Sequence, residues 1–387
     1  MKTSGLSELG GLPIRAWNWF WFTPADPTPL GVVRILCGVM VLYVHLAYCY
    51  DLMNFHGPHA VLDLPFINEL RNNMPIVRPN ASWEQEPPKI ENTIAEQEFV
   101  KRWGMYPSQA YTYGHPIFSL WFHVTDPTWM WVCHGAMMGI MFLFTIGFCT
   151  RVTGVLTWLS ILCYIQRSPT SLFGMDTIMN LLVFYLMIGP SGAALSVDRL
   201  LSRYWQNVRA RRAGLAIPES FSSPAPSISA NFALRLLQLH VCIVYLASGT
   251  SKLQGVAWWS GTAVWSTMAD FEFSPMRYQL YMNALYFLCE HRWLWELFMS
   301  GTAIFTLIFE IGFAVFVWNR HLRWLMIISA VMLHLGIAIF MGLVTFSLMM
   351  LVAVSSFVPA EAWHGLFALF HESRTRLRLA VVEGKAA

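Results

Sequence analysis

Several polar and ionisable residues stand inside or at the edge of long apolar stretches of this sequence. An ionisable side chain within a membrane span costs several kcal/mol unless it faces protein or water, so each such residue is a candidate site of chemistry. The residues are Arg34, Asp176, Asn180, Arg235, Gln238, His240, Lys252, Glu310 and His334.

Lys252 offers the most specific chemistry of this set. It follows a run of small residues, Ala247 to Ser251, which lets helices approach closely just before the lysine. A lysine held in a dry site beside aromatic rings has its charged form disfavoured by desolvation, and a neutral amine suits a general base. The alternative is a lysine whose long side chain only reaches the membrane–water interface.

Glu310 and His334 stand near the middle of later apolar stretches. A central carboxylate needs a cationic or protonating partner, and Arg34, Arg235 or His334 can each serve. Each residue also has a structural alternative. Glu310 can form an internal ion pair with no catalytic role, and His334 can make a single interhelical hydrogen bond. The two arginines can reach lipid phosphates from their helix ends.

Asp176 and Asn180 are four residues apart and therefore share one face of a predicted helix. Asp176 can support acid–base chemistry there, or it can only cap the start of the helix after Pro169-Thr170-Ser171. His240 is a second candidate for catalytic support, on the next predicted helix. The sequence contains no Cys-x-x-Cys, His-Glu-x-x-His, Walker or Gly-x-Ser-x-Gly motif. His56 and His59 with Asp63 are only a weak signal for a cation, so no metal site is inferred.

Composition identifies the surroundings of these residues. Of 387 residues, 56% are hydrophobic and 12% are charged, and the charged share is about half that of a soluble domain. The mean hydropathy is +0.48. These values exclude a disordered chain and disfavour an ordinary soluble globule. The net charge of +3 gives no indication of nucleic-acid binding. The sequence therefore predicts an all-α, polytopic transmembrane helix bundle in a lipid bilayer.

The apolar stretches set the expected number of spans. A span needs about 20 mostly apolar residues to cross about 30 Å of hydrocarbon. Applied along the chain, this rule predicts about eight spans. They cover about Leu30–Met53, Thr128–Phe148, Val152–Ile165, Leu172–Ile188, Phe232–Ser248, Leu297–Trp318, Trp324–Met341 and Leu343–Val358.

The orientation follows from lysine and arginine, which concentrate in cytoplasmic loops. The strongest basic cluster of the sequence follows the fourth predicted span. If this cluster is on the cytoplasmic side of the membrane, the other basic short loops and both termini are on that side too. The protein is therefore expected to be a multi-pass membrane protein with Lys252 near the outer face. The cluster comprises Arg199, Arg203, Arg209, Arg211 and Arg212.

Polar segments divide the chain around one predicted transmembrane domain of residues 30–358. The segment on the cytoplasmic side, residues 195–230, is expected to form an arginine-rich amphipathic helix followed by a linker rich in serine and proline. The segments are an interfacial segment (1–29), an outer-face insert (54–127), an inner basic loop (195–230), an outer-face segment (251–296) and a basic cytoplasmic tail (359–387).

The end of the fifth predicted span carries a family resemblance. The run Tyr245-Leu-Ala-Ser-Gly249-Thr-Ser-Lys252-Leu-Gln-Gly255-Val-Ala-Trp258-Trp-Ser-Gly261 resembles the horizontally transferred transmembrane domain (HTTM) family. The membrane bundle of that family is homologous to that of vitamin K-dependent gamma-carboxylase. The likeness covers about Thr23–Val358. Four further groups of residues carry the likeness. They are Phe22-Thr-Pro and Arg34 near the first span, Met175-Asp176 and Gly189-Pro190-Ser-Gly192 at the fourth, Glu310-Ile-Gly312, and His334-Leu-Gly336.

The resemblance implies a quinol-dependent enzyme. In the carboxylases, reduced vitamin K is oxygenated to its epoxide by O2. The strong base formed on the way removes a gamma proton from a peptide glutamate, and CO2 adds to the carbanion. Lys252 matches the lysine that deprotonates the hydroquinone. With Lys252 in this role, the resemblance implies that Asp176, His240, Glu310 and His334 give catalytic support. It also implies that Tyr245, Gly249, Trp258 and Trp259 lie around the quinol.

The chain departs from the carboxylases at one supporting position. They carry a histidine in the span that corresponds roughly to the fourth predicted span. Met175 and Asp176 are the nearest candidates in this sequence, which has no histidine in that stretch. The resemblance therefore gives no direct counterpart for the residue that supports the base.

Three functions fit these features. An enzyme would use Lys252 as base and act on a secreted peptide. A proton-coupled transporter would use Glu310 and His334 as a relay. A non-enzymatic scaffold would assist maturation of a secreted peptide with its outer segments. The enzyme predicts polar residues gathered around Lys252, the transporter predicts polar residues stacked from face to face, and the scaffold requires neither.

Overall fold

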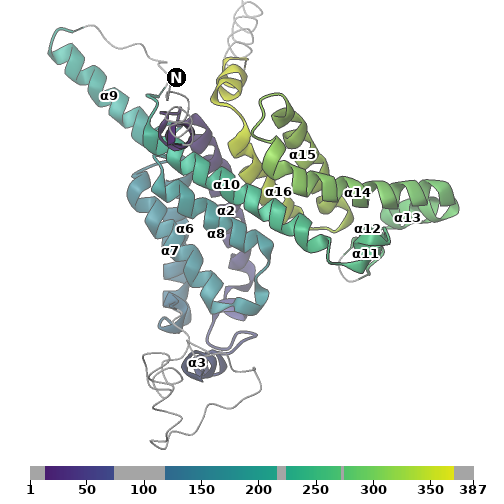
Figure 1. Cartoon of the computed structure of the whole chain (residues 1–387). Coiled ribbons are helices and arrows are strands. Elements are labelled where there is room, and N and C mark those ends of the chain that lie inside the picture. The colour runs from purple at the N-terminus through teal and green to yellow at the C-terminus, as the bar shows by residue number, and fades with distance from the viewer. Residues whose placement is uncertain (1–13, 74–117, 216–223, 272–273, 370–387) are drawn as a thin grey trace, which may run out of the picture. The chain divides into compact units, whose positions relative to one another are not determined.

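The computed structural model describes residues 14–73, 118–215, 224–271 and 274–369, and these ranges are mostly helical (Figure 1). An isolated β-bridge within them joins Ala25 and Ser227. The longer helices are α2 (Thr28–His56), α3 (Leu64–Asn73), α6 (Pro127–Ile146), α7 (Thr150–Arg167), α8 (Gly174–Ile188), α9 (Val197–Arg212), α10 (Ile228–Lys252), α13 (Gln279–Glu290), α14 (Arg292–Phe316), α15 (Leu322–Phe340) and α16 (Val344–Val354).

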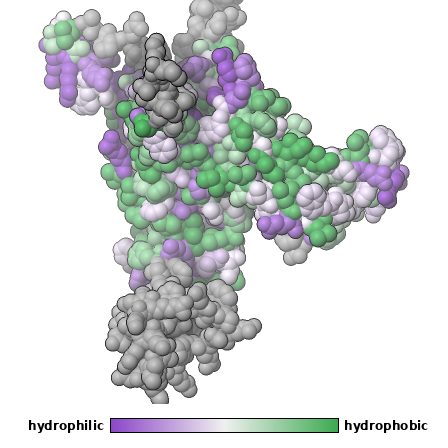
Figure 2. Space-filling view, in the orientation of Figure 1, coloured by the Kyte–Doolittle hydropathy of each residue, from purple (hydrophilic) through white to green (hydrophobic). Residues whose placement is uncertain are grey.

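Five helices of the described chain are long and apolar enough to cross a membrane: α2, α6, α10, α14 and α15. A sixth candidate consists of residues Val344–Phe357 and Ala360–Leu369, which meet at an angle of 105°. Hydrophobic side chains cover much of the visible surface over the helices (Figure 2). A helix needs an apolar surface of this kind to be stable in lipid. The fold is therefore that of an all-helical protein compatible with integral insertion in a membrane.

A helix covers each of the eight predicted spans, but three of these helices fall short of a full span. Helix α8 has 15 residues and α16 has 11. Helix α7 has 18 residues, but they include Arg151 and Arg167, which lower its mean hydropathy. The helical prediction is confirmed at all eight places, whereas the count of eight spans stays a prediction.

Parts of the predicted polar segments lie outside the described residues. In the second outer-face segment the chain forms α11 (Val256–Trp259), α12 (Ala263–Met268) and α13. The predicted amphipathic helix of the inner loop is α9. The parts outside the described residues are 1–13, 74–117, 216–223, 272–273 and 370–387.

The chain divides into two compact units. The first comprises residues 1–42, 140–157 and 173–387, and the second comprises residues 43–139 and 158–172. In the first unit α10 packs along α14, α15 along α16, and α16 against α8. These helices hold most of the polar residues that the sequence singled out, so the first unit contains the candidate site.

The second unit is centred on the ring of Tyr164. Its hydroxyl lies 2.7 Å from Nδ1 of His134, and the rings of His45, Tyr48 and His56 pack around it. The rings leave little space between them, because their centroids are 4.6–5.5 Å from that of Tyr164. The unit therefore has a filled aromatic core.

Arg34 shows how a buried charge can organise the first unit. It is 0% exposed, so it does not reach the surface as the interfacial alternative required. Its guanidinium donates hydrogen bonds to the backbone carbonyls of Ser191, Ala194 and Leu195, which follow α8. These carbonyls lie past the end of a helix, where backbone groups have no intrahelical partner. Arg34 therefore fastens the segment between α8 and α9 to α2.

Arg34→Leu is expected to lower the free energy of unfolding by at least about 3 kcal/mol, because it leaves several buried carbonyls unpaired. Arg34→Lys should recover part of the loss, since an ammonium can still donate. Unfolding of the purified protein in detergent, followed by circular dichroism, measures both. Leu36→Ala, at an exposed position of the same helix (39%), is the matched control. A loss in Arg34→Leu no larger than in the control would contradict this role.

Candidate functional site

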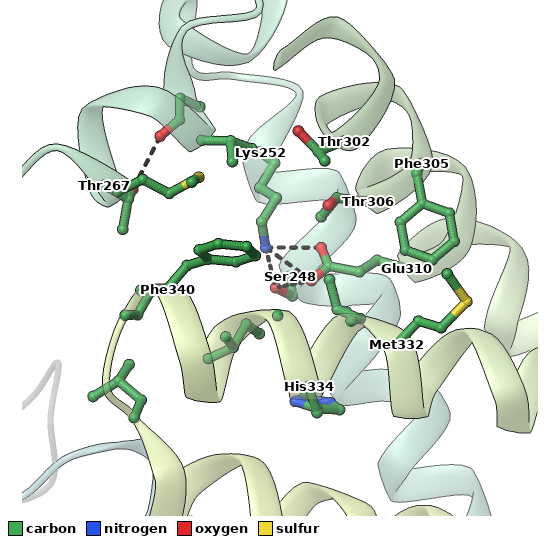
Figure 3. Close-up of a pocket in the computed structure, with 18 of the residues that line it drawn as sticks. Ser248, Lys252, Thr267, Thr302, Phe305, Thr306, Glu310, Met332, His334 and Phe340 are labelled. Atoms are coloured by element: carbon green, nitrogen blue, oxygen red, sulfur yellow. Dashed lines mark hydrogen bonds and ion pairs between the residues drawn. The ribbon is translucent and has the colours of Figure 1, made fainter. Parts of the chain in front are cut away.

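A cavity of about 650 Å³ lies in the first unit, between the end of α10 and helices α12, α14 and α15 (Figure 3). Its size is that of a pocket for a small organic molecule. We call it the Lys252 cavity. Most of its wall is apolar, and the large apolar side chains include Trp258, Phe298, Phe305, Phe340, Phe346 and Met350.

An ion pair between Lys252 and Glu310 faces this apolar cavity (Figure 3). Nζ of Lys252, at the end of α10, lies 2.8 Å from Oε2 and 3.0 Å from Oε1 of Glu310 on α14. It also donates to the Ser248 hydroxyl at 2.6 Å, and that hydroxyl donates to Oε1 of Glu310 at 3.3 Å. The Glu310 side chain is 8% exposed and that of Lys252 22%. Both charges are therefore largely removed from water.

Lys252 is thus the ionic partner of Glu310. The prediction that this partner is Arg34, Arg235 or His334 is wrong. Arg34 binds backbone carbonyls instead, and Arg235 stacks on aromatic rings near the first turns of α10. Lys252 and Glu310 are 58 positions apart in the chain, so no local spacing links them. Their pairing requires the packing of α10 on α14.

The two tryptophans of the Trp258-Trp259 pair have different positions. Trp258 lines the Lys252 cavity, and Nζ of Lys252 lies 5.3 Å from the centre of its ring, within cation–π range. Trp259 is 73% exposed, and its Nε1 donates to the carbonyl of Leu253 at 2.6 Å. Consecutive residues of a helix point about 100° apart, which separates the two rings. Trp258 therefore belongs to the cavity, and Trp259 lies outside it.

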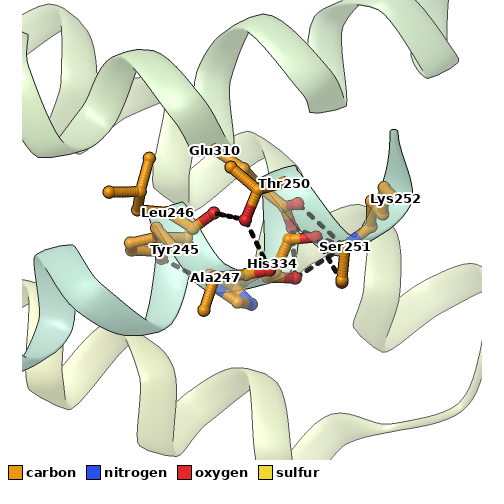
Figure 4. A network of polar contacts seen from close by, with 9 residues as sticks. Tyr245, Leu246, Ala247, Thr250, Ser251, Lys252, Glu310 and His334 are labelled. Carbon is orange, nitrogen blue, oxygen red and sulfur yellow. Dashed lines mark hydrogen bonds and ion pairs between the residues drawn. The ribbon is translucent and has the colours of Figure 1, made fainter. Parts of the chain in front are cut away.

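Tyr245 and His334 form a second polar group in the wall of the cavity (Figure 4). The Tyr245 hydroxyl lies 2.8 Å from Nε2 of His334, and both residues are 2% exposed. This contact is the interhelical hydrogen bond that the sequence offered as the structural alternative for His334. The other ring nitrogen, Nδ1, is buried and has no hydrogen-bond partner among the described residues. Buried polar atoms are normally paired, so Nδ1 is a candidate contact for a ligand.

Gly249 determines how closely α10 and α14 approach. A Cβ atom at this position would lie 2.8 Å from Cγ1 of Ile311 and 3.0 Å from Cβ of Glu310. Real Cβ atoms are not found that close to such neighbours, so only glycine fits without a shift of the helices. Gly249 does not line the cavity. It acts instead by allowing Glu310 to come within reach of Lys252.

Asp176 and His240 lie away from the Lys252 cavity. The Asp176 carboxylate accepts a hydrogen bond from the backbone N–H of Phe173 at 3.1 Å, as the capping alternative predicts for the start of α8. Nδ1 of His240 lies 3.0 Å from the hydroxyl of Tyr185, so this contact joins α10 to α8. Neither residue lines the cavity. The structure therefore brings together Tyr245, Lys252, Trp258, Glu310 and His334 from the predicted set.

Sequence reasoning missed the threonines of α14. Thr302 and Thr306 line the cavity on the same helix as Glu310 (Figure 3). The three residues are spaced four apart and therefore share one face of a helix. This spacing in the sequence was a signal that could have marked the polar side of an otherwise apolar helix. Ser248, the third contact of the ion pair, stood in the small-residue run without a role of its own.

The arrangement can bind a mostly apolar molecule and present it with a charged pair and a buried imidazole. Within the described residues, no three His, Cys, Asp or Glu side chains gather closely enough to hold a metal ion. Comparison with protein-family models, with curated proteins and with solved structures found no match for the chain.

Proposed function

We propose that this chain is an integral membrane enzyme that binds a lipid-soluble molecule in the Lys252 cavity and removes a proton from a hydroxyl group of that molecule. The Lys252–Glu310 ion pair in an otherwise apolar wall carries the proposal. Desolvation of two charges is costly, so such a pair is weak support for stability alone. Ionisable groups held in clefts under these conditions are characteristic of functional sites.

The two residues act as one proton acceptor. In the ionised pair, the Glu310 carboxylate accepts the proton of a ligand hydroxyl, and the hydroxyl becomes an anion. The Lys252 ammonium and the Ser248 hydroxyl then stabilise this anion by hydrogen bonds. Because Lys252 and Glu310 are in direct contact, the proton gained belongs to the pair rather than to either residue.

The wall of the cavity supports this chemistry in two ways. Its phenylalanine and methionine side chains exclude water, which strengthens the electrostatic effect of the pair and protects a basic product. Nδ1 of His334 provides a second polar contact, with the Tyr245 hydroxyl fixing the ring through Nε2. The cavity thus suits a molecule with polar atoms at two places and an apolar remainder.

The resemblance to the HTTM family supports a finer proposal for that molecule. Reduced vitamin K, a menaquinol-like quinol, has two ring oxygens and an apolar tail. It fits the ion pair, the imidazole and the apolar wall. When bound, a quinol supplies the electrons for reaction with O2. On the same resemblance, CO2 is the further co-substrate and a secreted peptide is the acceptor. We place the cavity near the outer face and both termini in the cytoplasm on the distribution of arginine.

The polar residues of α10 favour an enzyme over a proton-coupled transporter. Lys252, Ser248 and Tyr245 lie at one end, and Gln238 hydrogen-bonds the backbone of Ser356 toward the other. Between these two groups His240 contacts the Tyr185 hydroxyl of α8 and does not line the Lys252 cavity, and the buried residues there are Val241 and Cys242. The polar side chains therefore form separate groups rather than one row from face to face. A non-enzymatic scaffold would not require the ion pair.

The test is a quinol oxidation assay on the purified, lipid-reconstituted protein. Reduced vitamin K and O2 are supplied, and the epoxide is measured by chromatography beside a gamma-carboxylase as positive control. We expect epoxide from the intact protein and loss of at least about 100-fold in Lys252→Ala and Glu310→Gln, as for other residues that stabilise a reacting anion. Thr250→Ala, an exposed change on the same helix, should retain activity.

Two outcomes of this assay would contradict different parts of the proposal. If the intact protein forms no epoxide and binds no quinol by tryptophan-fluorescence quenching, the quinol is the wrong ligand. If epoxide forms equally well in Lys252→Ala and Glu310→Gln, the ion pair is not the proton acceptor. Folding of each variant is checked by its thermal unfolding midpoint, so a loss of activity through unfolding is recognised.

A further inference from the structure

Helix α9 has two sharply different faces. Projected at 100° per residue, its apolar residues fall within an arc of about 140°. The opposite side carries Ser202, Gln206 and the arginines Arg199, Arg203 and Arg209, whereas Arg211 and Arg212 flank the apolar residues in the last turn. The apolar residues are Val197, Leu200, Leu201, Tyr204, Trp205 and Val208.

The apolar face of α9 is exposed in the folded chain. Leu200 is 67% exposed, Tyr204 61% and Trp205 55%, and no residue of α9 is buried against the rest of the described chain. Large aromatic and aliphatic side chains gathered on one exposed helix face mark an interaction surface. This face therefore requires a partner that is not part of the described chain.

The start of α9 is fixed to the first unit at the beginning of α7. The Ser196 hydroxyl caps the helix by accepting from the N–H of Arg199. The Asp198 carboxylate accepts from the N–H groups of Cys149 and Thr150, at the beginning of α7, at 2.7 and 3.0 Å. Helix α9 therefore leaves the protein beside the ends of apolar helices rather than on a long tether.

The arginines identify the chemistry of the partner. Arg209, Arg211 and Arg212 form the last turn of α9, and all three are exposed. A helix with an apolar face and several arginines has the properties of one that lies in the plane of a membrane surface. Its aromatic residues enter the acyl boundary and its arginines contact phosphate groups. A protein partner would need an apolar groove with a negative rim, whereas the chain's own bilayer supplies both components beside α9.

We propose that the apolar face of α9 docks on the membrane surface and that its arginines select anionic phospholipids. The proposal is independent of the chemistry in the Lys252 cavity, because no residue of α9 lines that cavity. Docking on the membrane stabilises the helical conformation of α9. Without it α9 would unfold locally with ease, because a surface helix without tertiary packing is only marginally stable.

The test is hydrogen exchange, followed by mass spectrometry, on the full chain in nanodiscs. One set of discs contains phosphatidylcholine alone. The other set, called the anionic discs, contains phosphatidylcholine mixed with about 30% of the anionic lipid phosphatidylglycerol. Peptides covering residues 197–212 should exchange about 10-fold or more slowly in the anionic discs, because each arginine near such a surface adds to its attraction. Peptides from α13 are the internal control and should exchange alike in both discs.

Two variants separate charge from apolar contact. The triple variant Arg209→Gln, Arg211→Gln, Arg212→Gln should lose the difference between the two kinds of disc. Leu200→Ser with Trp205→Ser should lose protection in both. Unchanged exchange in α10 shows that each variant is folded. Equal exchange of 197–212 by the intact protein in both kinds of disc would overturn the proposal, as would protection that survives the triple arginine variant.

Discussion

Glu310→Ala is expected to lower the free energy of unfolding by about 3–5 kcal/mol, because it leaves the Lys252 ammonium unpaired in a largely buried site. Lys252 would lose both carboxylate contacts and keep only the Ser248 hydroxyl. Thermal or denaturant unfolding of the purified protein in detergent, followed by circular dichroism, measures the loss. Lys252→Met should be destabilising for the same reason, because it isolates the Glu310 carboxylate.

The double variant Lys252→Met with Glu310→Leu makes this prediction specific. Replacing a buried ion pair by apolar residues of similar volume is often neutral or stabilising, because neither charge has to be desolvated. We therefore expect the double variant to recover most of the stability that either single change loses. It should still form no epoxide, since both proton-transfer groups are gone. Stability and activity would then separate, which shows that the pair is kept for function.

An exposed ion pair on the same helix provides the matched control. Arg292 and Glu296 lie 2.7 Å apart in the first turns of α14, with side chains 78% and 56% exposed. Surface pairs of this kind contribute about 0–1 kcal/mol, so Glu296→Ala should change stability little. If Glu310→Ala costs no more than Glu296→Ala, the carboxylate of Glu310 is not a buried partner of Lys252.

Much of the fold could be predicted from sequence, because the apolar stretches are long enough to be read without tertiary information. A helix lies at each of the eight predicted spans, and the largest errors are in length. Helix α16 ends after 11 residues, and beyond a bend of 105° the chain continues as an apolar helix over Ala360–Leu369, in the part that the sequence assigned to the basic tail. Composition identifies apolar residues, but it does not determine where a helix bends.

The candidate site was predictable only in part. Lys252 and Tyr245 are seven residues apart, two turns of one helix, so local periodicity places them on the same side of α10. The partner of Glu310 could not be predicted, because it depends on the packing of α10 on α14. Gly249 does not line the cavity and lies where α10 and α14 approach closely, a role that the sequence alone did not indicate. Trp258 lines the cavity and helical rotation turns Trp259 out of it, so the shared role of both tryptophans around a quinol stays a prediction.

Gly301→Leu is expected to weaken binding of a quinol in the Lys252 cavity by about 100-fold or more, because overlap worth roughly 3 kcal/mol corresponds to that factor. Gly301 lies on α14 and lines the cavity, and a Cβ atom there would meet nothing within 4 Å. A leucine at this position therefore projects into the space that a ligand would occupy. Quenching of tryptophan fluorescence by a menaquinone analogue measures the change in affinity.

The same substitution should leave the fold intact, which distinguishes it from changes to the ion pair. Replacing a helical glycine that has free space removes a conformational cost of about 1 kcal/mol, so stability should be equal or higher. Gly135→Leu on α6 is the matched control, because its Cβ also meets nothing within 4 Å and it does not line the cavity. Gly249→Leu, by contrast, should destabilise the protein by forcing α10 away from α14. If Gly301→Leu binds the analogue as tightly as Gly135→Leu does, the ligand site lies elsewhere in the chain.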